Sequence, residues 1–349
     1  MKKHAFILLL AATFAGCETE TGTPATAPAI QGTFILNNGN WGDNDSNIGI
    51  YNINEGTYVP DVFFAANGER LGDLAQDMVV VGDKVIIAAY GSQNIVITDL
   101  SLNVISRINI THEKRTLSPR HLITFRGFVY ITFYEGFVGK FNPEDGSLYI
   151  IETGQNPEGM AVAGDYLYVA NSGGMNYPDY DNTLSIISLD SLEEIGSIEV
   201  NTNPVKIEAI SDGTAVYIFS YGNYASIPPK LQVVDSSGKI SDLEYSSVSD
   251  IAKSRDDILF ILCAGYDEQW NPLPGKVFIH DMNKNISLGE FIIDDTKLPG
   301  AYSISCAEDG YIYIGCSDYK NTGEMYVFDS NGRLQNRFDT QGLNPILAY

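Results

Sequence analysis

Short apolar strands and tight turns alternate along nearly the whole chain. Seven apolar strands end in comparable runs, such as GDKVIIAAY, GDYLYVANS and DGYIYIGCS, and Asp-Gly, Gly-Asp or Asn-Gly pairs separate many of the strands. Such pairs between alternating apolar runs are typical of β-hairpins. In six of the seven segments a short strand precedes the turn, and a third and a fourth strand follow. The pattern therefore predicts four-stranded antiparallel units.

These units recur about every 45 residues, the period of a β-propeller blade. One apolar position near the start of each unit marks the repeat: Met78, Leu122, Met160, Ile207, Ile251, Ile304 and Ala348. Seven copies predict an all-β fold, a seven-bladed β-propeller of four-stranded blades.

The two ends of the repeat region complete one blade. Residues 344–349 (NPILAY) match the openings of two earlier units, at 156–162 and 203–210, but no second strand follows them. Residues 32–39 (GTFILNNG) form a second strand with no first strand before it. We therefore expect the N- and C-terminal strands to share a blade and close the ring, which leaves no open sheet edge between the first and last blades.

The loops that join second to third strands are long and aromatic. In a propeller these loops emerge on one face, with the links between blades, while the tight hairpins occupy the other. Residues 170–182 (ANSGGMNYPDYDN) connect two strands that two to five residues would suffice to join. The loops contain these aromatic residues: Trp41, Tyr90, Tyr134, Tyr177, Tyr180, Tyr221, Tyr224, Tyr266, Trp270 and Tyr319. Aromatic side chains provide large, stiff contact areas with a polar tip, so we interpret this face as a binding surface; the alternative is that single tyrosines cap sheet ends.

The starts of the innermost strands carry polar side chains. They are Gln76, Asp77, Arg120, His121, Glu158, Lys206 and Asp250. Such positions face the central funnel in propellers, so we expect a polar ring at the mouth of the channel; the alternative is that these are solvated strand ends. We include Arg120, His121 and Lys206 among the ligand-binding candidates.

The N-terminus has the features of an export signal. Residues 1–16 combine two lysines with a short apolar run, too short to span a bilayer, and Cys17 follows directly after Ala-Gly. This arrangement resembles a bacterial lipobox, in which Cys17 would be lipidated, although Phe14 stands where leucine is usual. An ordinary soluble export signal is the alternative. Residues 17–31 form a tether of small residues and prolines, and the propeller occupies 32–349.

The composition limits which classes of molecule the protein can bind. The formal charge of −23 argues against nucleic acid, which needs clustered lysine and arginine. Besides Cys17, the chain has Cys263, Cys306 and Cys316, which lie in or beside apolar strands and are interpreted as small buried thiols rather than a disulfide.

Motifs for catalysis are missing from the sequence. There is no Gly-x-Ser-x-Gly elbow, haem motif, paired histidine motif or phosphate loop. We interpret His280 as a structural residue of a strand. Residues 43–47 (DNDSN) offer oxygen atoms that calcium could use, but turn formation is the alternative. We therefore expect a protein that is not an enzyme and has no catalytic cofactor.

The sequence also resembles a known group of proteins. The lipobox cysteine followed by Glu18 and Glu20, the tether, and the blade sequence NPEGMAVAGDYLYVANSGG resemble YncE-like propellers. More narrowly, the chain is similar to the surface-exposed cobalamin-binding lipoproteins of the BtuG group. The resemblance implies a propeller that captures cobalamin (vitamin B12) or related corrinoids outside the cell and delivers it to a TonB-dependent transporter of the outer membrane. It also implies a lipid-anchored protein of the outer membrane that faces the exterior.

Two other classes of function would use the same surface. A glycan-binding lipoprotein would stack the loop aromatics on sugar rings. A protein-interaction or adhesion propeller would bind a partner across the whole face.

Overall fold

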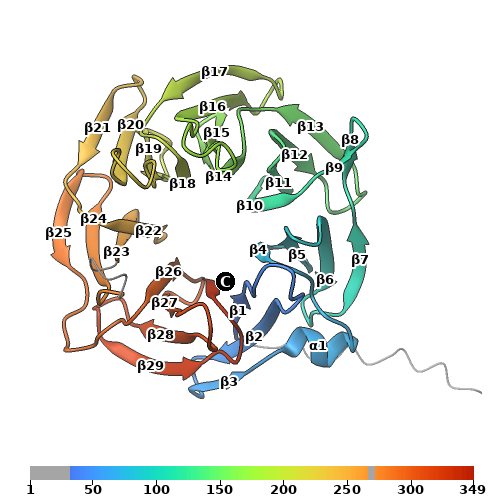
Figure 1. Ribbon diagram of the computed structural model, residues 1–349, viewed down its shortest axis with the longest axis vertical. Helices are drawn as coiled ribbons and strands as arrows, with labels where there is room; N and C mark the ends of the chain where they lie inside the picture. The colour runs from blue at the N-terminus through green and yellow to red at the C-terminus, as the bar shows by residue number, and fades with distance from the viewer. Residues whose placement is uncertain (1–31, 266–271) are drawn as a thin grey trace, which may run out of the picture.

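Seven four-stranded sheets surround a central channel in the computed structural model, which describes residues 32–265 and 272–349 (Figure 1). Each blade is antiparallel, and its first strand lies innermost. The prediction of a seven-bladed propeller is confirmed.

Blade 1 contains strands from both ends of the chain. Its strands, from the channel outward, are β30 (Pro345–Ala348), β1 (Thr33–Asn37), β2 (Asn47–Asn52) and β3 (Thr57–Val59). Ile35 on β1 is paired with Ala348 on β30, and the backbone N–H of Phe34 donates to the carbonyl oxygen of Tyr349. The expected closure of the ring is confirmed.

The other six blades follow in chain order. Blade 2 contains β4 (Ala75–Val81), β5 (Lys84–Ala89), β6 (Asn94–Asp99) and β7 (Val104–Ile108). Blade 3 contains β10 (Pro119–Phe125), β11 (Phe128–Phe133), β12 (Phe137–Phe141) and β13 (Leu148–Glu152). Blade 4 contains β14 (Pro157–Ala163), β15 (Tyr166–Asn171), β16 (Thr183–Ser188) and β17 (Glu194–Glu199). Blade 5 contains β18 (Pro204–Ala209), β19 (Ala215–Ser220), β20 (Lys230–Asp235) and β21 (Ile240–Leu243).

Blades 6 and 7 complete the ring. Blade 6 contains β22 (Val248–Lys253), β23 (Ile258–Cys263), β24 (Lys276–Asp281) and β25 (Ile286–Glu290). Blade 7 contains β26 (Ala301–Cys306), β27 (Ile312–Cys316), β28 (Glu324–Phe328) and β29 (Leu334–Asp339).

We call the face with the second-to-third-strand loops the upper face and the face with the tight hairpins the lower face.

Two links between blades carry structure that the sequence pattern did not predict. Helix α1 (Val62–Asn67) joins blade 1 to blade 2, and a small hairpin of β8 (Thr111–His112) and β9 (Arg115–Thr116) joins blade 2 to blade 3. Within the described residues α1 is the one helix, and none is long and apolar enough to cross a membrane.

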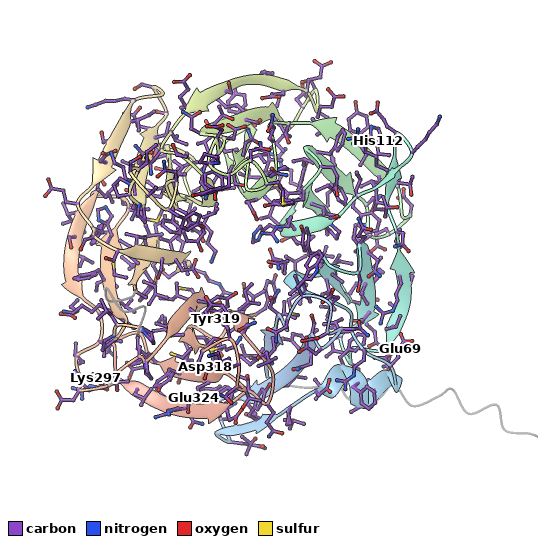
Figure 2. All side chains as sticks on the ribbon, viewed as in Figure 1. Glu69, His112, Lys297, Asp318, Tyr319 and Glu324 are labelled. Carbon is purple, nitrogen blue, oxygen red and sulfur yellow. The ribbon has the colours of Figure 1, made fainter. Side chains whose placement is uncertain are left out.

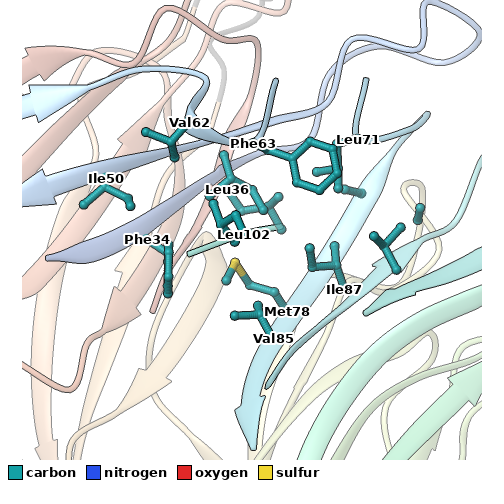
Figure 3. Packing of buried hydrophobic residues seen from close by; sticks show 14 residues of the cluster. Phe34, Leu36, Ile50, Val62, Phe63, Leu71, Met78, Val85, Ile87 and Leu102 are labelled. Carbon is teal, nitrogen blue, oxygen red and sulfur yellow. The ribbon is translucent and has the colours of Figure 1, made fainter. Parts of the chain in front are cut away.

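The core lies between neighbouring blades. The apolar residues that marked the repeat are buried, as is Phe63 of α1, which packs with Leu36, Leu71 and Met78 between blades 1 and 2 (Figure 3). Removing such side chains from water is the main stabilising contribution to a fold of this kind.

An asparagine precedes several inner strands, because the backbone there adopts a left-handed conformation. Asn156, Asn203 and Asn344 have φ angles of 46°, 60° and 57°, and each precedes the proline that begins an inner strand. Asparagine tolerates this left-handed conformation better than most residues. The repeated Asn-Pro pair therefore turns the chain from an outer strand of one blade into the channel.

Candidate functional site

A cavity of about 300 Å³ lies at the upper mouth of the channel. All seven polar residues expected at the mouth line it: Gln76, Asp77, Arg120, His121, Glu158, Lys206 and Asp250. They occupy equivalent places at the starts of β4, β10, β14, β18 and β22, which converge on the channel (Figure 1). We call this space the mouth cavity.

Four of these side chains form a continuous network of ionisable groups across blades 2 to 4. Asp77 Oδ2 lies 3.3 Å from His121 Nδ1, and His121 Nε2 lies 3.4 Å from Glu158 Oε2. The Glu158 carboxylate then accepts bonds of 2.8 Å from Nη2 and 3.0 Å from Nε of Arg120. Such a fork-shaped pairing fixes the orientation of both groups.

Arg120, His121 and Glu158 favour one another's charged forms. Burial lowers the pKa of Arg120 and of His121, but their carboxylate partners outweigh burial and raise both pKa values above the usual range. Burial raises the pKa of Glu158, and the two cations outweigh it, so that this pKa is lowered. Each ring nitrogen of His121 therefore lies beside a carboxylate oxygen, Nδ1 at Asp77 and Nε2 at Glu158.

Two aspartates of the mouth cavity join neighbouring blades. Asp250 pairs with Lys206 at 2.5 Å and accepts a bond of 3.0 Å from the backbone N–H of Ile304 in blade 7. Asp77 accepts a bond of 2.9 Å from the backbone N–H of Leu122 in blade 3. The floor of the cavity is therefore rigidly connected, because its carboxylates also hold the blades together.

One group of aromatic residues surrounds Arg120. Its guanidinium carbon lies 4.7 Å from the centroid of the Tyr90 ring and 4.8 Å from that of Tyr134. Tyr90 contacts Tyr134 edge-on at 5.6 Å, and Trp41 leans on Tyr90 at 5.8 Å. Burial raises the pKa of both tyrosines, so their hydroxyl groups stay neutral.

A second group of aromatic residues comes from blades 4 and 5. Tyr177 and Tyr180 of the long loop 172–182 contact each other at 6.0 Å, and Tyr180 contacts Tyr224 at the same distance. Tyr224 stacks on Tyr221 at 5.9 Å, and Tyr221 lines the mouth cavity. The long loop therefore connects the outer part of this face to the cavity floor. We call the two groups together the aromatic rim: Trp41, Tyr90, Tyr134, Tyr177, Tyr180, Tyr221 and Tyr224.

The outer members of the rim are open to solvent. Trp41, Tyr177 and Tyr224 are 69%, 70% and 66% exposed. Large exposed aromatic rings on one face are characteristic of interaction sites. Tyr224 also has a φ of 56°, a conformation that bulky residues seldom adopt and that is concentrated at functional sites.

Several lining residues were not predicted from the sequence. Tyr302 and Ser303 of β26 and Ile346 and Leu347 of β30 line the same cavity. Tyr302 contacts Tyr319 at 5.5 Å, and Figure 2 shows Tyr319 on the inner side of blade 7. Tyr302 holds the same repeat position as Arg120, two residues before the apolar marker, so a strict alignment of the repeats would have found it.

Tyr266 and Trp270 lie outside the described residues, as does Cys17, and their predicted roles stay predictions. The binding roles of the other predicted residues likewise stay predictions, although the structure places them in the aromatic rim and around the mouth cavity: Trp41, Tyr90, Tyr134, Tyr177, Tyr180, Tyr221, Tyr224, Arg120, His121 and Lys206.

His280 and the three described cysteines lie in the blades, whereas His112 lies on the β8–β9 hairpin. His280 is buried, with its ring nitrogens 3.1 Å from Tyr245 Oη and 3.0 Å from Asn285 Oδ1, which is consistent with a structural role. The ring of His112 packs edge-on against that of Phe137, at the outer edge of the propeller (Figure 2). The three cysteines of the described region are free thiols, two of them buried and Cys306 partly buried.

The acidic loop of blade 1 forms a turn. Asp45 Oδ1 accepts a bond of 2.9 Å from the backbone N–H of Asn40, and Asn47 Oδ1 accepts one of 2.9 Å from Asn37. Within residues 32–265 and 272–349, no three or more His, Cys, Asp or Glu side chains are grouped to hold a metal ion.

No protein-family model matches the sequence, and no curated protein matches it. Among solved structures, the chain is similar to hydrazine synthase of Kuenenia stuttgartiensis, with 18% identity and a TM-score of 0.59 over 73% of this chain and 76% of that one. It is also similar to a putative 6-phosphogluconolactonase from Bacteroides uniformis ATCC 8492, with 12% identity and a TM-score of 0.63 over 92% of this chain and 99% of that one. At these identities the similarity supports the propeller fold and nothing finer.

Proposed function

We propose that this protein is a lipid-anchored corrinoid-binding protein of the YncE-like and BtuG-like type. It would hold cobalamin on the upper face and pass it to a TonB-dependent transporter in the outer membrane. The observation that carries the binding part of the proposal is the aromatic rim around the mouth cavity, with exposed rings outside and a rigid polar floor inside.

The chemistry of a corrinoid suits such a surface. A corrinoid is a broad disc edged with amide groups, so it offers both a flat apolar area and many hydrogen-bonding groups. Rings such as Trp41, Tyr177 and Tyr224 can contact the disc, while the polar floor meets its amides. Because a closed ring of blades fixes these groups before the ligand arrives, little conformational entropy is lost on binding.

The lipid anchor and the delivery step rest on the resemblance and on the N-terminal sequence. Cys17 would carry the lipid, and residues 18–31 would hold the propeller away from the membrane. In this proposal the protein is not an enzyme, and the lactonase name of one similar structure is not transferred to it at 12% identity.

Calorimetric titration of cyanocobalamin into soluble protein beginning at Glu18 tests the binding. We expect one-to-one binding that weakens at least tenfold, or by about 1.4 kcal/mol, in Trp41→Ala and in Tyr224→Ala. The matched control is Tyr149→Ala, because Tyr149 is 52% exposed on the outer strand β13, far from the rim. Its affinity should equal that of the wild type.

A lack of heat at micromolar protein would overturn the corrinoid assignment. The same rim variants would then be screened on glycan arrays, since exposed aromatic rings also stack on sugars. Delivery is tested separately, by corrinoid-limited growth of cells that carry Cys17→Ala. Normal growth with normal protein abundance would contradict the need for a lipid anchor.

A further inference from the structure

A second and larger cavity lies on the lower face, remote from the aromatic rim. It has a volume of about 590 Å³ and sits between blade 6 and blade 7, which are neighbours in the ring (Figure 1). Its walls come from β23, β24 and β25 on one side and from β26 and β27 on the other. We call it the interblade cavity.

The inner walls of the interblade cavity are apolar. Phe260, Phe291 and Ile312 are buried members of the core between the two blades, and the rings of Phe260 and Phe291 meet edge-on at 4.9 Å. Ile279 is partly buried against the same core. Leu288, by contrast, is 48% exposed and lies at the cavity as well, so apolar surface continues from the core to the solvent.

Charged residues gather at the hairpin tips on the lower face. Arg255, on the hairpin between β22 and β23, pairs with Glu308, on the hairpin between β26 and β27. This ion pair therefore connects the two blades beside the cavity. Both side chains are about 70% exposed, so water screens their attraction and the pair can open at little cost.

Lys253, the other cation that lines the interblade cavity, is already paired. Lys253 Nζ lies 3.1 Å from Asp257 Oδ1 and 3.4 Å from Ser211 Oγ. The opening thus has two cations, Lys253 and Arg255, and three carboxylates, Asp256, Asp257 and Glu308, so it does not favour an anionic ligand. An apolar interior with a polar opening suits a molecule with an apolar body and a single uncharged polar end.

We propose that the interblade cavity binds a small amphiphile, with its apolar part against Ile279 and Leu288, over the core rings of Phe260 and Phe291, and its polar end beside Arg255 and Glu308. The volume lies within the usual range for small-molecule sites, roughly 300 to 1,000 Å³, and the lining of aromatic and aliphatic residues with a few polar groups is typical of them. This site is independent of the upper face and of any corrinoid.

Equilibrium dialysis with decan-1-ol, below its solubility limit, tests the proposal on the soluble chain from Glu18. We expect saturable one-to-one binding. Ala307→Phe places a ring at the cavity lining and should weaken binding at least tenfold. Ser191→Phe adds the same ring to an exposed hairpin of the lower face in blade 4, and should bind as the wild type does.

A second measurement serves if Ala307→Phe does not fold. Cys306 lines the interblade cavity and is partly buried, so decan-1-ol should slow its labelling by N-ethylmaleimide at least threefold, as measured by peptide mass spectrometry. Unchanged labelling at saturating decan-1-ol would overturn the proposal. So would an absence of binding, or binding that Ala307→Phe leaves intact. Loss of decan-1-ol binding in Tyr224→Ala would instead assign the ligand to the upper face and overturn it equally.

Discussion

The guanidinium carbon of Arg120 lies 4.7 Å from the centroid of the Tyr90 ring, in the angle between Tyr90 and Tyr134. One face of each tyrosine is therefore occupied by a cation of the protein itself. What Tyr90 and Tyr134 offer to a ligand is their edges and remaining surface, whereas Trp41 and Tyr224 offer open rings. The inner part of the rim is a fixed support and the outer part is the exposed contact surface.

Replacing Arg120 should destabilise the fold. Arg120→Ala leaves the buried carboxylate of Glu158 without its main partner, and removing one member of a buried ion pair typically costs about 3 to 5 kcal/mol. Urea unfolding measures the change in free energy. Lys276→Ala is the control, because the Lys276–Glu290 pair is largely exposed and should contribute about 1 kcal/mol or less. Equal losses in the two variants would contradict the importance of burial.

Asp250 should stabilise the junction of blades 6 and 7. Asp250→Ala removes the acceptor for the buried backbone N–H of Ile304 and the partner of Lys206, so we expect a loss of about 3 kcal/mol or more. Asp250→Asn keeps an oxygen acceptor and should lose less. Thermal unfolding of the two variants separates these effects, and identical melting temperatures would show that the hydrogen bond to Ile304 adds nothing.

Stability should fall between weakly acidic and neutral pH because of Glu208. Burial raises the pKa of Glu208 to about 7 from 4.5, against the opposing attraction of Lys206 and Lys253. Because the folded-state pKa lies above the unfolded-state value, this group's contribution to stability is complete below pH 4.5 and is lost as the pH rises through 7. At about 1.36 kcal/mol per pKa unit, the loss is about 3 kcal/mol at most.

Glu208→Gln removes this titration while keeping the shape of the side chain. The variant should gain stability relative to the wild type as the pH rises from 5 to 8, in urea unfolding followed at each pH. Parallel stability curves for the two proteins would contradict the assignment.

His121 should not ligate cobalt if the proposed corrinoid binds. Its two ring nitrogens face Asp77 and Glu158, so neither is available to displace water from the metal. The visible spectrum of aquocobalamin should therefore keep its band positions when the protein is added. A band shift that disappears in His121→Gln would show that the imidazole leaves its carboxylates to reach the metal.

The ring was predictable because the repeat is regular. The apolar positions from Met78 to Ala348 fall at one place in every inner strand, and the Asn-Pro pairs before β14, β18 and β30 repeat a single turn. Such local signals determine strands and turns, and seven equal units leave few ways to arrange them. Helix α1 interrupts the pattern with only six residues, too few for a helical period to be recognised.

The site was predictable in its composition but not in its pairings. Loop length and aromatic content marked the upper face, and the starts of the inner strands marked the mouth cavity. Arg120 and Glu158 are 38 positions apart, and nothing in the sequence says that they meet. The interblade cavity was not foreseen either, because a cavity depends on how well the side chains of two blades fill the space between them.

The pairing of β1 with β30 makes closure of the ring depend on the last described strand. β1 comes first in the chain and β30 after every other described strand, so the inner edge of β1 has no partner until β30 is in place. Until then Ile35 and Leu36 lie on a strand whose inner edge is open, and another unfinished chain could join that edge. A chain that stops before Pro345 never leaves that condition. Only a chain that includes β30 can therefore cover the inner edge of β1 and close the ring.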